Sequence, residues 1–183
     1  GYTLFIMESR ILFLGTGGDS IVVGKQIRQS GGIILNIGDN QFHIDPGPGA
    51  LLNMKLASIN PRETTALLVT HNHINHCNDV NAVIEAMTYS GMDKRGVLLC
   101  NKTLYDGAEN FLPYLTEFHK NCVERSIALS EKQKAAINDV ELLVTKTLHS
   151  EPNNIGFKFF TKSFVLGYTS DTELSDEIIA QYK

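Results

Sequence analysis

Three of the six histidines in this 183-residue chain lie close together, between Thr70 and His76. His71 and His73 are two positions apart, so in an extended chain their side chains point to the same side, and His76 can approach after a bend. Neutral imidazole is a good ligand for zinc, and also for iron, nickel or copper. The types and spacing of these residues therefore predict a metal site rather than three unrelated polar side chains.

The histidine segment follows an apolar run at residues 65–70, which predicts a buried strand. The carboxyl end of a buried strand is a common place for a site in a layered protein. Further strands are predicted at residues 10–14, 32–37, 41–44, 97–100, 140–148, 155–160 and 163–168. Helices are predicted at residues 50–57, 79–89, 104–114 and 176–182, the last capped by Ser175. The expected fold is α+β, with sheets covered by helices.

Composition and charge narrow the class of protein. Lys and Arg number 16 against 20 Asp and Glu, a formal net charge of −4, so there is no overall basic footprint for nucleic acid. No stretch approaches the roughly 20 apolar residues of a membrane helix. We find no repeat and no linker, which predicts a single domain over residues 1–183.

Two further features of the chain bear on its setting. Residues 2–7 are apolar without a preceding basic residue, unlike a signal peptide, and residues 1–6 are interpreted as a vector remnant ahead of Met7. Cys77, Cys100 and Cys122 are widely spaced, and they form neither a disulfide framework nor a zinc-binding pair. We therefore expect a reducing, cytoplasmic setting.

The histidine segment resembles the His-x-His-x-Asp-His signature of the metallo-β-lactamase superfamily, with Asn75 where Asp is usual. Three flanking stretches agree. The Gly-Thr-Gly-Gly run at residues 15–18 resembles the opening of the tRNase Z and phosphodiesterase branches, residues 45–49 resemble an Asp-x-Gly turn, and residues 167–172 resemble a Gly-Asp-Thr strand end. The resemblance spans about residues 10–172 and implies an αββα sandwich.

The resemblance also implies how the ligands divide between two metals. His71, His73 and His149 would hold the first metal, and His76 would belong to the second. Asp171 would bridge the two. The implied cofactor is zinc, as one or two ions, with manganese as an alternative.

Other residues have weaker assignments. The resemblance places Asp45 behind a ligand, where it would accept a hydrogen bond from an imidazole, although a simple turn former before Pro46 is an equal alternative. For Asp171 the alternative is a helix or turn cap. His43 and His119 match no landmark and are expected to be surface or strand residues.

Two departures from the family pattern both affect the second metal. Asn75 is a neutral, weaker ligand than Asp and cannot do general acid or base work. The family usually completes this site with a later histidine, but none of the 12 residues after Asp171 is His. We therefore expect a form without the family's last elements, with one firmly bound metal and a weak second position. Asn75 and Asp171 remain the candidate catalytic residues.

Hydrolysis is the reaction class that such a site favours. A zinc held by three histidines with an open position supplies hydroxide near neutral pH, and two metals can clamp a phosphodiester. The Gly-Thr-Gly-Gly opening favours a phosphodiesterase, and the acidic charge favours a small phosphodiester or cyclic nucleotide over long nucleic acids. The alternatives are a single-metal hydrolase of esters, thioesters or lactones, and a non-catalytic member of the fold. The sequence leaves the oligomeric state open, a homodimer included.

Overall fold

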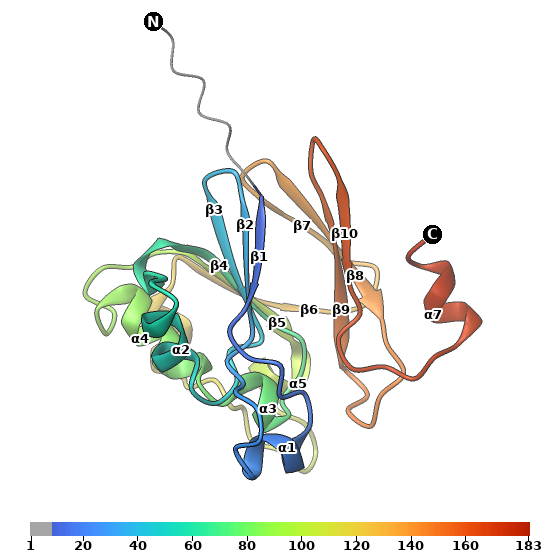
Figure 1. The fold of residues 1–183 in the computed structure, drawn as a ribbon, viewed down its shortest axis with the longest axis horizontal. Helices are drawn as coiled ribbons and strands as arrows, with labels where there is room; N and C mark the ends of the chain where they lie inside the picture. Colours follow the sequence, from blue (N-terminus) through green and yellow to red (C-terminus); the bar gives the residue numbers. More distant parts are fainter. Residues whose placement is uncertain (1–8) are drawn as a thin grey trace, which may run out of the picture.

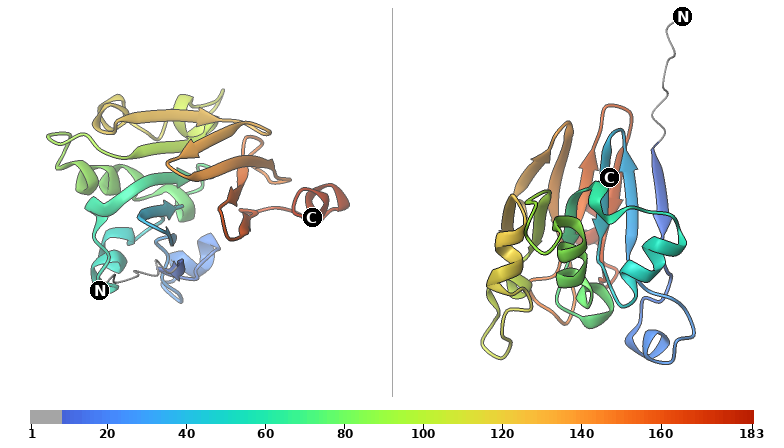
Figure 2. Two further views of the ribbon diagram at one scale, coloured as in Figure 1. Left: turned by 90° about the horizontal axis from the view of Figure 1, so that it is seen from above. Right: turned by 90° about the vertical axis from the view of Figure 1, so that its left-hand side faces the viewer.

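The computed structural model describes residues 9–183, which form two β-sheets packed face to face with helices on the outside (Figures 1 and 2). Most helices cover the outer face of the first sheet, and one short helix lies beside the second sheet. The α+β sandwich expected from the sequence is therefore confirmed. The interpretation of residues 1–6 as a vector remnant lies outside the described residues.

The first sheet contains six strands in the order β1-β2-β3-β4-β5-β6. The first three strands pair antiparallel, and β3 to β6 pair parallel. Parallel strands are normally covered on both faces and so carry continuous apolar runs, and all of Ala66 to Val69 in β4 is inaccessible to solvent. The bounds are β1 (Arg10–Phe13), β2 (Ile33–Ile37), β3 (Asn40–Ile44), β4 (Thr64–Val69), β5 (Val97–Asn101) and β6 (Arg125–Leu129).

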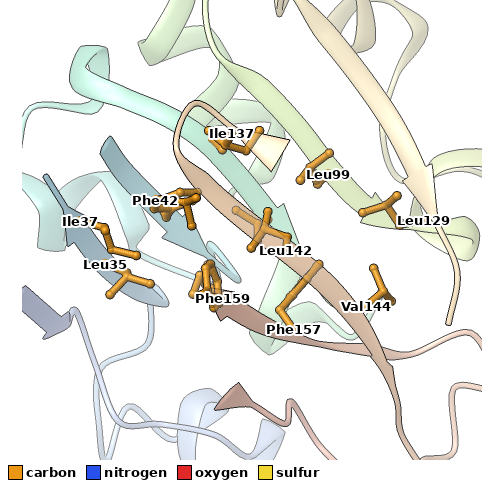
Figure 3. Packing of buried hydrophobic residues seen from close by; sticks show 14 of the residues in the cluster. Leu35, Ile37, Phe42, Leu99, Leu129, Ile137, Leu142, Val144, Phe157 and Phe159 are labelled. Atoms are coloured by element: carbon orange, nitrogen blue, oxygen red, sulfur yellow. The ribbon is translucent and has the colours of Figure 1, made fainter. Parts of the chain in front are cut away.

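The second sheet is antiparallel throughout, in the order β10-β9-β8-β7. Its inner face meets the first sheet in a core that includes Phe42, Leu99 and Phe157 (Figure 3). The rings of Phe42 and Phe159 meet edge to face at 5.6 Å, and burying each such side chain stabilises the fold by about 1.5–3 kcal/mol. The bounds are β7 (Lys134–Ile137), β8 (Val140–Lys146), β9 (Ile155–Phe160) and β10 (Val165–Tyr168).

The helices are short, and the apolar residues of α2, α4, α5 and α6 pack on the first sheet. In α4, Val80, Val83, Ile84 and Met87 follow helical spacing and are fully buried. Ser175 accepts a hydrogen bond from the Ile178 amide and so caps α7, as expected. The bounds are α1 (Ser20–Gly24), α2 (Ala50–Leu56), a 3-10 turn (Pro61–Glu63), α3 (Ile74–Cys77), α4 (Val80–Thr88), α5 (Lys102–Asp106), α6 (Glu117–Cys122) and α7 (Asp176–Ala180).

The helix predicted at residues 104–114 is wrong in extent. α5 ends at Asp106 because Gly107 has φ 80° and ψ −170°, a conformation that glycine alone adopts readily. A tight turn follows, in which the amide of Ala108 and the carbonyl of Phe111 form a hydrogen bond of 2.8 Å. The sequence patterns also missed α1, α6, β6 and β7.

Several chain segments meet at one end of the sandwich. The carboxyl ends of β3, β4 and β5, the loop between β8 and β9, and the end of β10 all reach the lower edge in Figure 1. The histidine segment begins there, directly after β4. Among the described residues, no helix is long and apolar enough to span a membrane.

Candidate metal centre

Three imidazole nitrogens converge at this end of the fold. Nε2 of His71 lies 3.0 Å from Nδ1 of His73, and Nε2 of His149 lies 3.1 Å from the same Nδ1. A ring nitrogen carries either one proton or one lone pair, so Nδ1 of His73 can form a hydrogen bond with only one of these two neighbours. A tetrahedral zinc with Zn–N bonds of about 2.0–2.1 Å would space its ligands by roughly 3.3 Å. The donor set therefore fits a cation better than it fits a hydrogen-bond network.

The protein also fixes which nitrogen of His71 is free. The Thr70 hydroxyl donates to the Asp45 carboxylate, at 2.9 Å from Oδ2. Its 3.0 Å contact with Nδ1 of His71 must then have the imidazole as donor, which leaves Nε2 with its lone pair toward the cluster. Burial, together with the nearby His76, lowers the pKa of His71 to about 3 despite Asp45. The ring is thus kept in the neutral form that a metal ligand needs.

His71, His76 and Asp171 form a second group whose ligand atoms lie within 4.8 Å of one another. Nε2 of His76 is buried without a hydrogen-bond partner and lies 3.4 Å from Oδ2 of Asp171. Burial lowers the pKa of His76, but the charge of Asp45 and the contacts of both carboxylates outweigh it and raise the pKa to about 10. This position therefore favours positive charge, which either a proton or a metal ion can supply.

Asp45 connects this group to the sheets. Its buried carboxylate accepts hydrogen bonds from the Thr70 amide (2.8 Å), the Thr70 hydroxyl and the Tyr168 hydroxyl (2.7 Å), and it lies 3.0 Å from Nδ1 of His76. Asp45 has φ 52°, rare for a residue other than glycine. Its carbonyl also accepts from the Gly47 amide, so Asp45 both forms the turn and contacts an imidazole.

Asn75 lies within the ligand segment, but its side chain is engaged elsewhere. Its Nδ2 donates to the Gly18 carbonyl at 3.1 Å, and its own carbonyl accepts from the Ser30 hydroxyl. A Cβ added at Gly47 would lie 2.1 Å from this carbonyl, so that turn needs glycine. Asn75 therefore ties the Gly-Thr-Gly-Gly loop to α3.

The two remaining histidines lie outside both groups. His43 is in β3, as allowed by the sequence, but it is fully buried and its Nε2 lies 2.8 Å from the Gly31 carbonyl. Of the two positions expected for His119, a strand is wrong: it lies on α6, partly exposed, with its Nε2 3.0 Å from Glu85. The patterns also missed Tyr168, whose signal was limited to its position three residues before Asp171 in the stretch that resembles a strand end.

An αββα sandwich with this cluster at its edge defines the metallo-β-lactamase fold. The chain belongs to that superfamily, because residues 40–183 match the sequence model of the beta-lactamase superfamily domain.

Individual relatives agree with this assignment. The chain is 32% identical over 176 residues to the uncharacterized protein MJ1374 of Methanocaldococcus jannaschii, covering 96% of this chain and 66% of that protein. It is 31% identical over 111 residues to ribonuclease Z of Pyrococcus furiosus, covering 61% of this chain and 33% of the enzyme. The chain thus spans less than two thirds of either relative.

A solved structure shows the same fold. The metallo-beta-lactamase fold protein YhfI of Bacillus subtilis superposes with a TM-score of 0.70 at 17% identity, covering 91% of this chain and 63% of that protein.

Proposed function

We propose that this chain is a metal-dependent hydrolase acting on small phosphodiesters. The observation that supports it most is the convergence of imidazole nitrogens from His71, His73 and His149, with the ring of His71 already oriented by Thr70. Zinc is the ion that suits three imidazoles at this spacing, with manganese as the alternative. Similarity to a ribonuclease Z favours phosphodiesters among the possible substrates, and the net charge of −4 favours small ones.

The protein's own groups prepare the site before any substrate arrives. Thr70 orients the ring of His71, and Asp45 orients the ring of His76. The side chain of Asp171 is 37% exposed, with Oδ2 3.4 Å from His76 and 3.9 Å from His149, so it can meet substrate. Its contact with His76 lowers the pKa of Asp171, so it does so as a carboxylate. A bound divalent ion would act as a Lewis acid on the phosphoryl oxygen and lower the pKa of water.

One observation favours a second candidate, a single-metal hydrolase of esters, thioesters or lactones. The Asn75 amide donates to Gly18, and a neutral amide contributes less than a carboxylate to holding a second cation. A non-catalytic protein that keeps the fold and one metal would share this feature.

The experiment that tests the proposal measures metal and turnover on the same preparation. The chain loaded with zinc or manganese should accelerate hydrolysis of bis-p-nitrophenyl phosphate over its uncatalysed rate more than that of p-nitrophenyl acetate, and His73→Ala should accelerate neither. Preference for the acetate would support the second candidate. Metal binding without turnover of either substrate would support the non-catalytic alternative.

A further inference from the structure

A cavity of about 510 Å³ adjoins the histidine cluster on the side of His73. Its walls are largely apolar and come from α3, the turn after α5 and the loop before β9: Ile74, Phe111, Leu112, Tyr114 and Pro152. Phe111 is 60% exposed and Leu112 is 91% exposed. Neighbouring apolar side chains left open to solvent beside a polar site commonly mark a binding surface.

The turn that carries Phe111 is held in place from both ends. Gly107 begins it, and a Cβ there would lie 2.4 Å from the Phe111 carbonyl. Tyr114 ends it, since its hydroxyl donates to the Asn78 carbonyl at 3.0 Å and its own carbonyl accepts from Asn81. The backbone hydrogen bonds between Ala108 and Phe111 close the turn. The apolar wall is thus formed without a ligand, which reduces the entropic cost of binding.

The charges around the cavity exclude an anion from it. Glu109 and Glu151 are the charged residues that line it, and both are acidic. The buried carboxylate of Glu151 already accepts hydrogen bonds from Asn101 and Thr103, at 2.9 and 2.6 Å. It therefore stabilises the cavity wall and is not free to bind a ligand. A phosphate would be repelled here, whereas a neutral planar group would gain apolar contact.

We propose that this cavity is a substrate subsite that takes a neutral, planar aromatic group of nucleobase size, attached to a phosphodiester whose phosphate lies at the histidines. Phe111 is the specificity-determining residue, because it offers an exposed aromatic face on which such a group can stack. The inference rests on the proposed function, since it names the substrate group next to the scissile ester.

The first test uses adenosine, which lacks a phosphate and therefore reports on the cavity alone. Zinc-loaded protein should bind it saturably, with amide resonances shifting at residues 110–112. Phe111→Ala should weaken binding by about fivefold or more, the loss of one stacking contact, and Phe111→Tyr should retain it. The matched control is Phe118→Ala, which removes another phenylalanine, 53% exposed, from α6. Absence of saturable binding, or equal binding by Phe111→Ala, would overturn the subsite.

The second test separates this inference from the proposed function. Phe111→Ala should raise KM for bis-p-nitrophenyl phosphate severalfold while kcat stays within about twofold, because the ring contacts the aromatic group in both ground and transition states. An unchanged KM would count against the subsite. Adenosine binding that depends on Phe111, in protein that turns over no phosphodiester, would support the subsite and overturn the proposed hydrolysis.

Discussion

The hydroxyl of Tyr168 donates a 2.7 Å hydrogen bond to Oδ2 of Asp45, 123 positions earlier in the chain. The same oxygen lies 3.0 Å from Nδ1 of His76. One carboxylate oxygen thus connects the end of β10 in the second sheet with a candidate ligand that follows β4 in the first. This contact couples the packing of the two sheets to the orientation of an imidazole.

Tyr168→Phe should weaken metal binding as well as lowering the stability of the fold. The phenyl ring preserves packing, but Asp45 loses a donor and His76 loses part of its orientation. We expect the free energy of unfolding to fall by about 1 kcal/mol and the metal affinity of the group formed by His71, His76 and Asp171 to fall about tenfold. Denaturant unfolding and competition with a chelating dye measure the two effects.

Tyr105→Phe is the matched control for this effect. The Tyr105 hydroxyl contacts Oγ of Ser126 at 3.1 Å, in a part-buried position on α5. A comparable loss of stability with unchanged metal affinity is expected. If both variants reduced metal affinity equally, the Asp45 contact would have no special role in positioning His76.

Periodicity predicts well the elements whose burial is continuous. The run over β4 and the spacing of Val83, Ile84 and Met87 on α4 reflect residues with no exposed surface. By contrast, β7 has only four residues, and Ile137 is the one that is buried, so its alternation of exposed and covered positions is too short to detect. The helix predicted at residues 104–114 ends early at Gly107: the sequence shows the glycine, but only the fold shows that it adopts φ 80° and ends the helix there.

In the candidate site too, local features could be predicted from the sequence, and contacts between distant segments could not. Type and spacing alone indicated a metal site at His71, His73 and His76, because ligands near each other in sequence follow one strand end. The contact of Tyr168 with Asp45 and the burial of His43 depend on strands brought together by the fold, so no local pattern could reveal them. The hydrogen bond from Asn75 to Gly18 spans 57 positions and is equally invisible in the sequence.

His73→Ala should abolish tight metal binding. The Nδ1 of His73 is the atom that both His71 and His149 approach, so its removal takes away the centre of the ligand set. Elemental analysis of protein purified without added metal should find close to one equivalent in the parent. His119→Ala, which removes a histidine on α6, should retain it. Full metal content in His73→Ala would show that the ion is held elsewhere.

Metal removal should destabilise the fold. An ion that binds only folded protein contributes RT ln(1 + [L]/Kd), or about 2.7 kcal/mol at a hundredfold excess over Kd. EDTA should therefore lower Tm by several degrees in metal-containing parent but leave His73→Ala unchanged. An equal fall in both proteins would point to an effect of EDTA that is unrelated to this site.

His43 should make the metal-free protein sensitive to mild acid. Burial lowers its pKa from 6.5 to about 4, against the opposing effects of the Gly31 carbonyl, Asp45 and Asp79. The unfolded chain takes up the proton first, so the stability contribution is complete above pH 6.5 and is lost as pH falls toward 4. The loss should reach about 2 kcal/mol by pH 5.

His43→Gln isolates this contribution. Its amide can still donate to the Gly31 carbonyl but does not titrate. Unfolding measured at pH 7 and pH 5 in the presence of chelator should show a smaller loss of stability in the variant than in the parent. Parallel losses in the two proteins would assign the acid sensitivity to other groups.

Asn75→Asp should make the stability of the fold depend more strongly on metal. It should also increase the affinity of the second site, at His76 and Asp171, for a metal ion. A carboxylate cannot donate to the Gly18 carbonyl, and losing this exposed hydrogen bond should cost about 0.5–1.5 kcal/mol in chelated protein. Rotated toward His76 and Asp171, however, the new carboxylate adds a charged oxygen ligand to a group that already favours positive charge.

Added zinc or manganese should therefore restore the stability of Asn75→Asp, raise its metal content above that of the parent and increase its turnover of bis-p-nitrophenyl phosphate. Asn78→Asp is the control, because it adds the same charge three positions later on an exposed side chain. Elemental analysis measures the gain in metal binding, and Tm with and without metal measures the loss of stability in the metal-free protein. An Asn75→Asp variant with the parent's stoichiometry, rate and response to chelator would contradict the idea that Asn75 limits the second site, and the single-metal alternative would then be favoured.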